Sequence, residues 1–120
     1  MRLAVLLLLL LALPAAAQTG LRATDTRFTG TGLADALSGN TVEFFDGSLA
    51  TYRADARYEY RYAPGDPVWR GTWEATASEV CVAFDNGRSR CDTFVRADDR
   101  LVLVIERGDR FPVRTLSPED

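Results

Sequence analysis

Cysteine is the residue type whose chemistry is easiest to place in this sequence. The only two cysteines, Cys81 and Cys91, stand on either side of Asn86-Gly87. Their separation of ten residues does not match a redox Cys-x-x-Cys motif, and two thiols without histidine cannot complete a usual zinc site. We therefore favour a structural disulfide over a redox-active or metal-binding pair.

The turn between the cysteines decides whether they can meet. Asn-Gly between two apolar runs is a strong hairpin signal, because both residues tolerate positive φ. A two-residue loop, Asn86-Gly87, leaves the cysteines offset. A three-residue loop, Asp85-Asn86-Gly87, places Cys81 opposite Cys91 in a non-hydrogen-bonded pair, where Cα atoms lie ~4.5 Å apart and a disulfide can form. We predict the three-residue loop and a cross-strand disulfide.

The chain contains no histidine. This absence removes Ser-His-Asp and Cys-His triads, most catalytic zinc sites and the commonest general base near neutral pH. The serines lack a G-x-S-x-G context, and the glycines form no standard phosphate loop. We expect a protein that is not an enzyme and holds no cofactor or metal. An enzyme without histidine ranks third, after a binding module and a protein-interaction or inhibitor domain that acts through an edge strand or loops.

Aromatic residues form the second group with possible function. Five of them alternate along two predicted strands that are joined by the Pro64–Pro67 loop: Tyr58, Tyr60, Tyr62, Trp69 and Trp73. If these strands pair, the rings share one face of the sheet, either as ordinary core packing or as a ligand-binding wall. A row of three tyrosines favours a face that is not wholly buried. These five residues are the candidate ligand site.

Charged residues alternate with the aromatic ones on the same two strands. Arginine and glutamate predominate on this opposite face: Arg57, Glu59, Arg61, Arg70 and Glu74. Two interpretations stand: exposed ion pairs that contribute little to stability, and paired arginines that recognise an anionic group. The acidic pair Asp98-Asp99 is interpreted as part of a turn.

The N-terminus has the pattern of an export signal. Met1-Arg2 precedes the apolar run Leu3–Leu13, and an Ala-x-Ala exit ends at Ala17. This pattern predicts a secretory signal peptide over residues 1–17, with an uncleaved anchor helix as the alternative; the run is too short to span a membrane. A cysteine pair fits an oxidising compartment. We expect the protein in the periplasm of a bacterium or outside the cell.

Net charge narrows the range of partners. The chain carries a formal charge of −3, with arginines and acids interspersed and no basic stripe. A nucleic-acid partner and an anionic membrane surface are therefore disfavoured. We expect a monomer whose partner is a small amphipathic ligand or an envelope protein.

The pattern of the remaining chain predicts the elements that must position these residues. Residues 18–29 are expected to be a flexible lead or an irregular edge segment, residues 30–116 a single β domain, and residues 117–120 a loose tail. Thr31–Gly39 predicts one short helix, with Thr31 as its cap and Gly39 as its stop. The predicted strands outside the cysteine hairpin are Thr41–Phe45, Leu49–Arg53, Arg57–Tyr62, Val68–Ala75, Leu101–Ile105 and Phe111–Leu116.

These elements predict an all-β fold. About eight short strands joined by tight turns form an antiparallel meander. We expect a small closed or half-open barrel with the helix plugging one end, and a two-sheet β-sandwich is the alternative. The unbroken apolar run Leu101–Ile105 predicts a strand covered on both faces, and Pro112 predicts that the last strand lies at a sheet edge.

Three motifs together resemble a group of small secreted alphaproteobacterial proteins of unknown function. They are Leu37-Ser38-Gly39-Asn40-Thr41, then Gly71-x-Trp73, then the two cysteines astride their hairpin. The resemblance spans roughly residues 30–107 and implies export and a small β domain, without known catalytic residues. Gly71-x-Trp73 is also similar to the Gly-x-Trp of lipocalin-like barrels. In those barrels the motif lies on the first strand, whereas in this sequence it lies near mid-chain.

Overall fold

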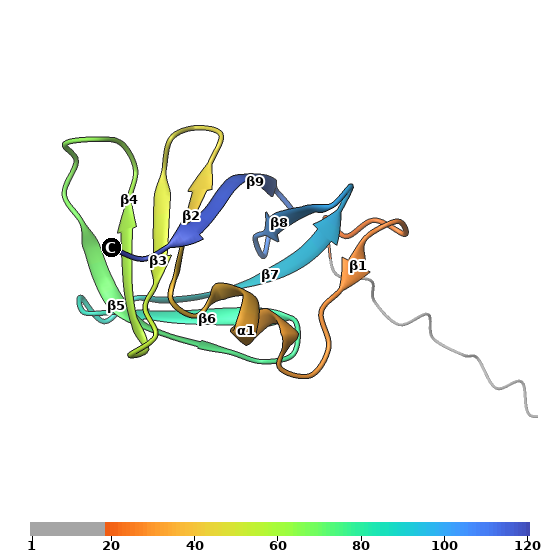
Figure 1. Cartoon of the computed structure of the whole chain (residues 1–120), viewed down its shortest axis with the longest axis horizontal. Helices are drawn as coiled ribbons and strands as arrows, with labels where there is room; N and C mark the ends of the chain where they lie inside the picture. Colours follow the sequence, from red (N-terminus) through yellow and green to blue (C-terminus); the bar gives the residue numbers. More distant parts are fainter. Residues whose placement is uncertain (1–18) are drawn as a thin grey trace, which may run out of the picture.

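The strands of this protein close on themselves to form a barrel. The computed structural model of the chain describes residues 19–120, so the predicted signal peptide lies outside the described residues. The eight barrel strands follow in chain order (Figure 1): β2 (Asn40–Phe44), β3 (Leu49–Tyr52), β4 (Arg57–Arg61), β5 (Trp69–Ala75), β6 (Glu79–Phe84), β7 (Ser89–Ala97), β8 (Arg100–Val104) and β9 (Arg110–Pro118).

Every barrel strand pairs antiparallel with its neighbours along the chain, and β9 pairs with β2 to complete the ring. Val42 lies opposite Leu116 at this closing seam. The predicted meander and closed barrel are therefore confirmed in preference to the two-sheet sandwich. Closure leaves no long unpaired edge between β2 and β9.

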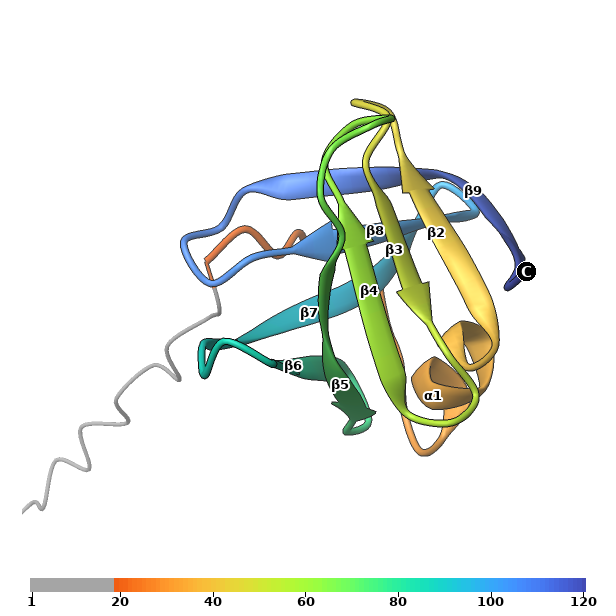
Figure 2. The same ribbon diagram turned by 90° about the vertical axis from the view of Figure 1, so that its left-hand side faces the viewer.

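A short helix, α1 (Gly32–Leu37), lies at the end of the barrel where β2 begins (Figure 2). Leu33 and Leu37 are fully buried and belong to the same apolar cluster as the inward side chains of the strands. Gly39 follows the helix with φ 77°, the left-handed conformation predicted for its stop. Thr31 stands at the N-cap position, as predicted, but its side chain does not cap the helix. The Thr31 hydroxyl accepts no backbone N–H and donates to the Asp35 carboxylate at 3.0 Å.

The strand β8 is covered on both faces, as its apolar sequence predicted. Leu101 and Leu103 face the barrel interior, whereas Val102 and Val104 pack outward in a second buried cluster with Val95. Leu21, from the segment before the barrel, also packs on this outer cluster. The same segment supplies a ninth strand, β1 (Thr26–Arg27), which pairs with β7.

The last strand is not a sheet edge, so the prediction drawn from Pro112 is wrong. β9 pairs with β8 on one side and with β2 on the other. Proline is accommodated because the pairing with β2 begins only at Val113, one residue later. The missing N–H of Pro112 therefore costs no hydrogen bond to β2. β9 also runs past the predicted end of the strand, to Pro118.

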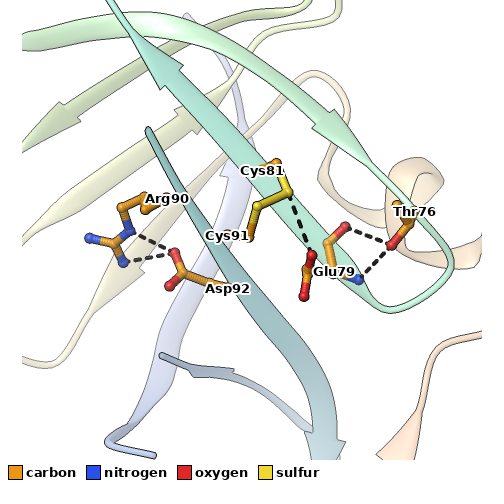
Figure 3. The surroundings of a disulfide bond; sticks show 6 residues. All are labelled: Thr76, Glu79, Cys81, Arg90, Cys91 and Asp92. Carbon is orange, nitrogen blue, oxygen red and sulfur yellow. Dashed lines mark hydrogen bonds and ion pairs between the residues drawn. A yellow bond between two sulfur atoms is a disulfide. The ribbon is translucent and has the colours of Figure 1, made fainter. Parts of the chain in front are cut away.

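The cysteine hairpin has the predicted three-residue loop. The Phe84 N–H donates to the Arg88 carbonyl at 2.7 Å, and Gly87 has φ 88°. This register places Cys81 directly opposite Cys91, with Cα atoms 4.0 Å apart and the sulfurs bonded (Figure 3). The disulfide lies on the outer face of the barrel, because the alternate residues of β6, Val80 and Val82, are in the core.

Candidate functional site

A cavity of about 280 Å³ opens into the barrel at the end away from α1. Side chains from β2, β3, β4, β7, β8 and β9 line it, together with the turns that follow β2 and β8. Apolar groups, including Phe44, Leu103 and Phe111, alternate around the wall with tyrosines and arginines. The interior is therefore packed solid near the helix and hollow at the opposite end.

All four tyrosines of the chain line this cavity: Tyr52, Tyr58, Tyr60 and Tyr62. Because side chains alternate along a strand, every second residue of β4 points inward. The exposure of these tyrosines increases toward the mouth of the barrel: Tyr52 is 2% exposed, Tyr58 5% and Tyr62 59%. Tyr52 and Tyr58 form the floor, with ring centroids 5.2 Å apart, and Tyr62 stands at the rim.

The hydroxyls of the two floor tyrosines have no hydrogen-bond partner in the part of the chain that the structure describes. Within residues 19–120, neither Tyr52 nor Tyr58 makes a side-chain hydrogen bond. Both hydroxyl oxygens keep some accessible surface. Burial raises the pKa of Tyr58 and, more strongly, that of Tyr52. Both phenols therefore keep their protons at neutral pH and face the cavity as hydrogen-bond donors and acceptors.

An ion pair adjoins this floor. Arg90 and Asp92 lie two residues apart on β7 and project from the face of the strand opposite Cys91 (Figure 3). The Nε and Nη2 atoms of Arg90 approach one carboxylate oxygen of Asp92 at 2.8 and 2.7 Å. Asp92 is only 8% exposed, and burial raises its pKa although the Arg90 charge acts in the opposite direction.

Arg90 stands where the cavity meets its neighbours. Together with Tyr60 and Tyr62 it also lines a second hollow of about 300 Å³, which Trp69 and Phe84 bound on the far side. It lines a third, shallower hollow beside Asp92 as well. Arg90 therefore lines three neighbouring hollows at the mouth of the barrel.

Two turns hold the rim. After β2, the Asp46 carboxylate accepts hydrogen bonds from the backbone N–H of Ser48 at 2.9 Å and from its hydroxyl at 2.6 Å. These bonds lower the pKa of Asp46. After β8, the Arg107 side chain donates to Asp109 at 2.6 Å and remains largely exposed. At the rim, Asp46 therefore has hydrogen-bond donors in Ser48, and Arg107 has a counter-ion in Asp109.

The structure separates the five aromatic residues that the sequence grouped together. Tyr58, Tyr60 and Tyr62 line the cavity, and Trp69 bounds the neighbouring hollow. Trp73 lies farther along β5, where its indole N–H donates to the Arg53 carbonyl at 2.9 Å. The ring of Trp73 packs edge-on against Tyr52 from the closed side, with centroids 5.5 Å apart.

Sequence reasoning did not single out Tyr52, Arg90 or Asp92 as site residues. A signal for the last two existed, because the alternation that turns Cys91 outward turns Arg90 and Asp92 inward with Phe94. Tyr52 gave no such signal. It is the only aromatic residue of β3, and it reaches the cavity only because the barrel is closed.

The charged face opposite the tyrosines forms ion pairs on the outside of the barrel. Glu59 contacts Arg53 at 3.4 Å and Arg70 at 3.7 Å, and Arg57 contacts Asp85 at 3.2 Å. The arginines are partly or largely exposed, which favours the interpretation of this face as weak surface pairing. The sulfurs beside Glu79 are joined as a disulfide, so neither is a thiolate ligand.

No protein-family model, curated protein or solved structure matches this chain. Among the described residues, no helix is both long and apolar enough to cross a bilayer. The function is therefore argued from the cavity and its lining.

Proposed function

We propose that this protein is a non-enzymatic binding module of the bacterial envelope, which holds a small amphipathic ligand in the mouth of its barrel. The observation that carries the proposal is the cavity lined by all four tyrosines. An interior filled by side chains to both ends would have favoured a purely structural barrel. A hollow end with aromatic walls and a few polar groups is typical of small-molecule sites.

The dimensions of the cavity support a small ligand. Its volume of about 280 Å³ lies just below the range of ~300–1,000 Å³ that small-molecule sites occupy. Tyrosine provides rigid apolar area together with a hydroxyl, which suits a ligand that has both apolar and polar parts. The neighbouring hollow at Trp69 offers room for a second portion of the same molecule.

Two observations support binding without catalysis. The chain has no histidine, and the tyrosines of the floor have raised pKa values, which makes them poor bases at neutral pH. The disulfide and the export pattern of residues 1–17 support a place outside the cytoplasm.

A second candidate function is supported by the uneven pairing of β7. Its residues pair with β6 from Ser89 onward, but with β8 only from Thr93 onward. The stretch Ser89–Asp92 therefore has one side without a strand partner among the described residues. An extended segment of an envelope protein that adds beside this stretch would make the protein an interaction or inhibitor domain.

The two tryptophans provide the test of the ligand hypothesis. In Trp73→Phe the remaining indole, Trp69, lies beside the mouth, whereas in Trp69→Phe the remaining indole lies at the closed end. Octyl glucoside and dihexanoylphosphatidylcholine, each below its micelle concentration, are expected to shift the emission of Trp73→Phe with saturation. Trp69→Phe should respond much less. No saturable change, or equal changes in both variants, would count against the proposal.

A further inference from the structure

The cavity has polar groups at its buried end and apolar groups at its rim. Its most buried part carries the hydroxyls of Tyr52 and Tyr58 and adjoins the Arg90–Asp92 pair. Its rim carries Phe111, which is 37% exposed, and the ring of Tyr62. A ligand that enters with its polar group first would meet polar groups at the floor and apolar surface at the rim.

The side chains at the floor of the cavity have hydrogen-bond donors that no other part of the protein uses within residues 19–120. The hydroxyls of Tyr52 and Tyr58 are unpaired within residues 19–120, and both side chains are more than nine-tenths buried. Arg90, whose side chain is 45% exposed, uses its Nε and Nη2 atoms on Asp92, which leaves Nη1 without a protein acceptor among the described residues. A bound group must satisfy these donors at least as well as water does, because an unsatisfied buried donor is costly.

The charge at the floor is already balanced, because Arg90 is paired with Asp92. At the rim, Arg107 is paired with Asp109, and the Asp46 carboxylate accepts hydrogen bonds from Ser48. A ligand carboxylate placed at the floor would come close to the Asp92 carboxylate, which adjoins the lining, and a ligand ammonium would come close to Arg90. Either charge would lie beside an ion pair of zero net charge, so the cost of its desolvation would not be offset.

We propose that the cavity selects an uncharged hydrogen-bond acceptor, such as the carbonyl of a carboxamide or ester, carried on an apolar body and bound with the carbonyl innermost. Tyr52, Tyr58 and Arg90 donate to the carbonyl oxygen, and the apolar body lies against Ile105 and Phe111 toward the rim. This inference rests on the proposed function and adds to it the class of ligand and its direction of entry.

Three probes with one tail and different heads test the charge selection. Octanamide, octanoate and octylamine are titrated at neutral pH into Trp73→Phe, with Trp69 emission as the readout. Octanamide is expected to bind at least about tenfold more tightly than either charged probe. If octanoate or octylamine binds as tightly as octanamide, the inference is overturned while the proposed function stands. If all three probes fail to bind, and octyl glucoside and dihexanoylphosphatidylcholine fail as well, both are overturned.

Removing single hydroxyls tests the orientation. In the Trp73→Phe background, Tyr52→Phe and Tyr58→Phe are each expected to weaken octanamide binding about three- to tenfold, since each deletes one donor and keeps the ring. Thr72→Ala is the control, because this hydroxyl lies on the exposed face of β5 and does not line the cavity, and it should change binding less than twofold. Thermal melting confirms that each variant folds. Unchanged binding in both floor variants, or an equal loss in Thr72→Ala, would overturn the carbonyl-innermost arrangement.

Discussion

Asp25 and Arg110 form a bidentate ion pair that ties the segment before β1 to the start of β9. Nη1 of Arg110 donates to Oδ2 of Asp25 at 2.8 Å, and Nη2 donates to Oδ1 at 2.9 Å. Nη1 also donates to the Gly20 carbonyl at 2.8 Å. The Asp25 side chain is only 2% exposed and that of Arg110 12%, so this pair is far better shielded than those on the outer face of β4.

Loss of this pair should destabilise the protein in a pH-dependent way. Asp25→Asn is expected to lower the free energy of unfolding by about 1–3 kcal/mol at neutral pH. The hydrogen bonds from Arg110 hold the pKa of Asp25 below its ordinary 3.8, so the stabilisation is complete above pH 3.8 and is lost as the pH falls through the lower folded-state pKa. Urea denaturation at neutral and acid pH measures the difference.

The exposed pair Arg107–Asp109 provides the control for Asp25. Asp109→Asn removes a carboxylate that accepts from Arg107 through one oxygen and whose surroundings are largely solvent, and it should change the free energy of unfolding by less than about 1 kcal/mol. If the two variants lose the same stability at neutral pH, burial does not distinguish the two pairs.

Asp92 should have the opposite pH dependence. Burial raises its pKa above 3.8, so its contribution to the free energy of unfolding falls as the pH rises from 3.8 through the folded-state pKa. Asp92→Asn lacks this titration. The stability of the variant relative to the native protein is therefore expected to increase from acid to neutral pH, measured by urea denaturation.

Asp46 offers a comparison for the Asp92 experiment. The hydrogen bonds from Ser48 lower its pKa, so its contribution is complete above pH 3.8 and is lost below it. Asp46→Asn should therefore lose its disadvantage to the native protein as the pH falls below 3.8. A disadvantage of Asp92→Asn relative to the native protein that grows from acid to neutral pH would show that desolvation does not dominate at Asp92.

The disulfide should stabilise the fold without shaping the cavity. Because Cys81 and Cys91 close a short loop on the outer face, the double variant Cys81→Ala/Cys91→Ala is expected to lose about 3 kcal/mol of unfolding free energy. Octanamide affinity, read from Trp69 emission in the Trp73→Phe background, should be unchanged. Reduction of the native protein should reproduce the same loss of stability. An unchanged denaturation midpoint after complete reduction would contradict the prediction.

Gly71 allows β5 and β6 to approach closely. A Cβ at this position would overlap the Ala83 carbonyl oxygen and lie 2.9 Å from the Phe84 Cα. Gly71→Ala is therefore expected to lower the free energy of unfolding by about 1–3 kcal/mol, as measured by urea denaturation. Thr72→Ala, on the exposed face of the same strand, should change it by no more than about 0.5 kcal/mol. Equal effects of the two substitutions would show that the backbone at Gly71 relaxes freely.

Elements that depend on neighbours in the chain could be predicted from the sequence. The left-handed stop at Gly39, the three-residue turn ending at Gly87 and the pairing of Cys81 with Cys91 all follow from local φ preferences and the two-residue period of a strand. The double coverage of β8 followed from its unbroken apolar run. The stop, the turn and the cysteine pairing involve residues at most a hairpin apart, where few conformations compete.

The site needed the tertiary structure. Trp69 and Trp73 share a face of β5, but four residues of strand span ~13 Å, which places one at the mouth and the other at the closed end. Tyr52 and Arg90 meet at one cavity although they come from strands far apart in the chain. The sequence by itself determined the strands, the turns and the disulfide, because these depend on local geometry. Only closure of β9 onto β2 decided which inward side chains share a space and where that space stays open, because register and curvature around a barrel depend on all strands together.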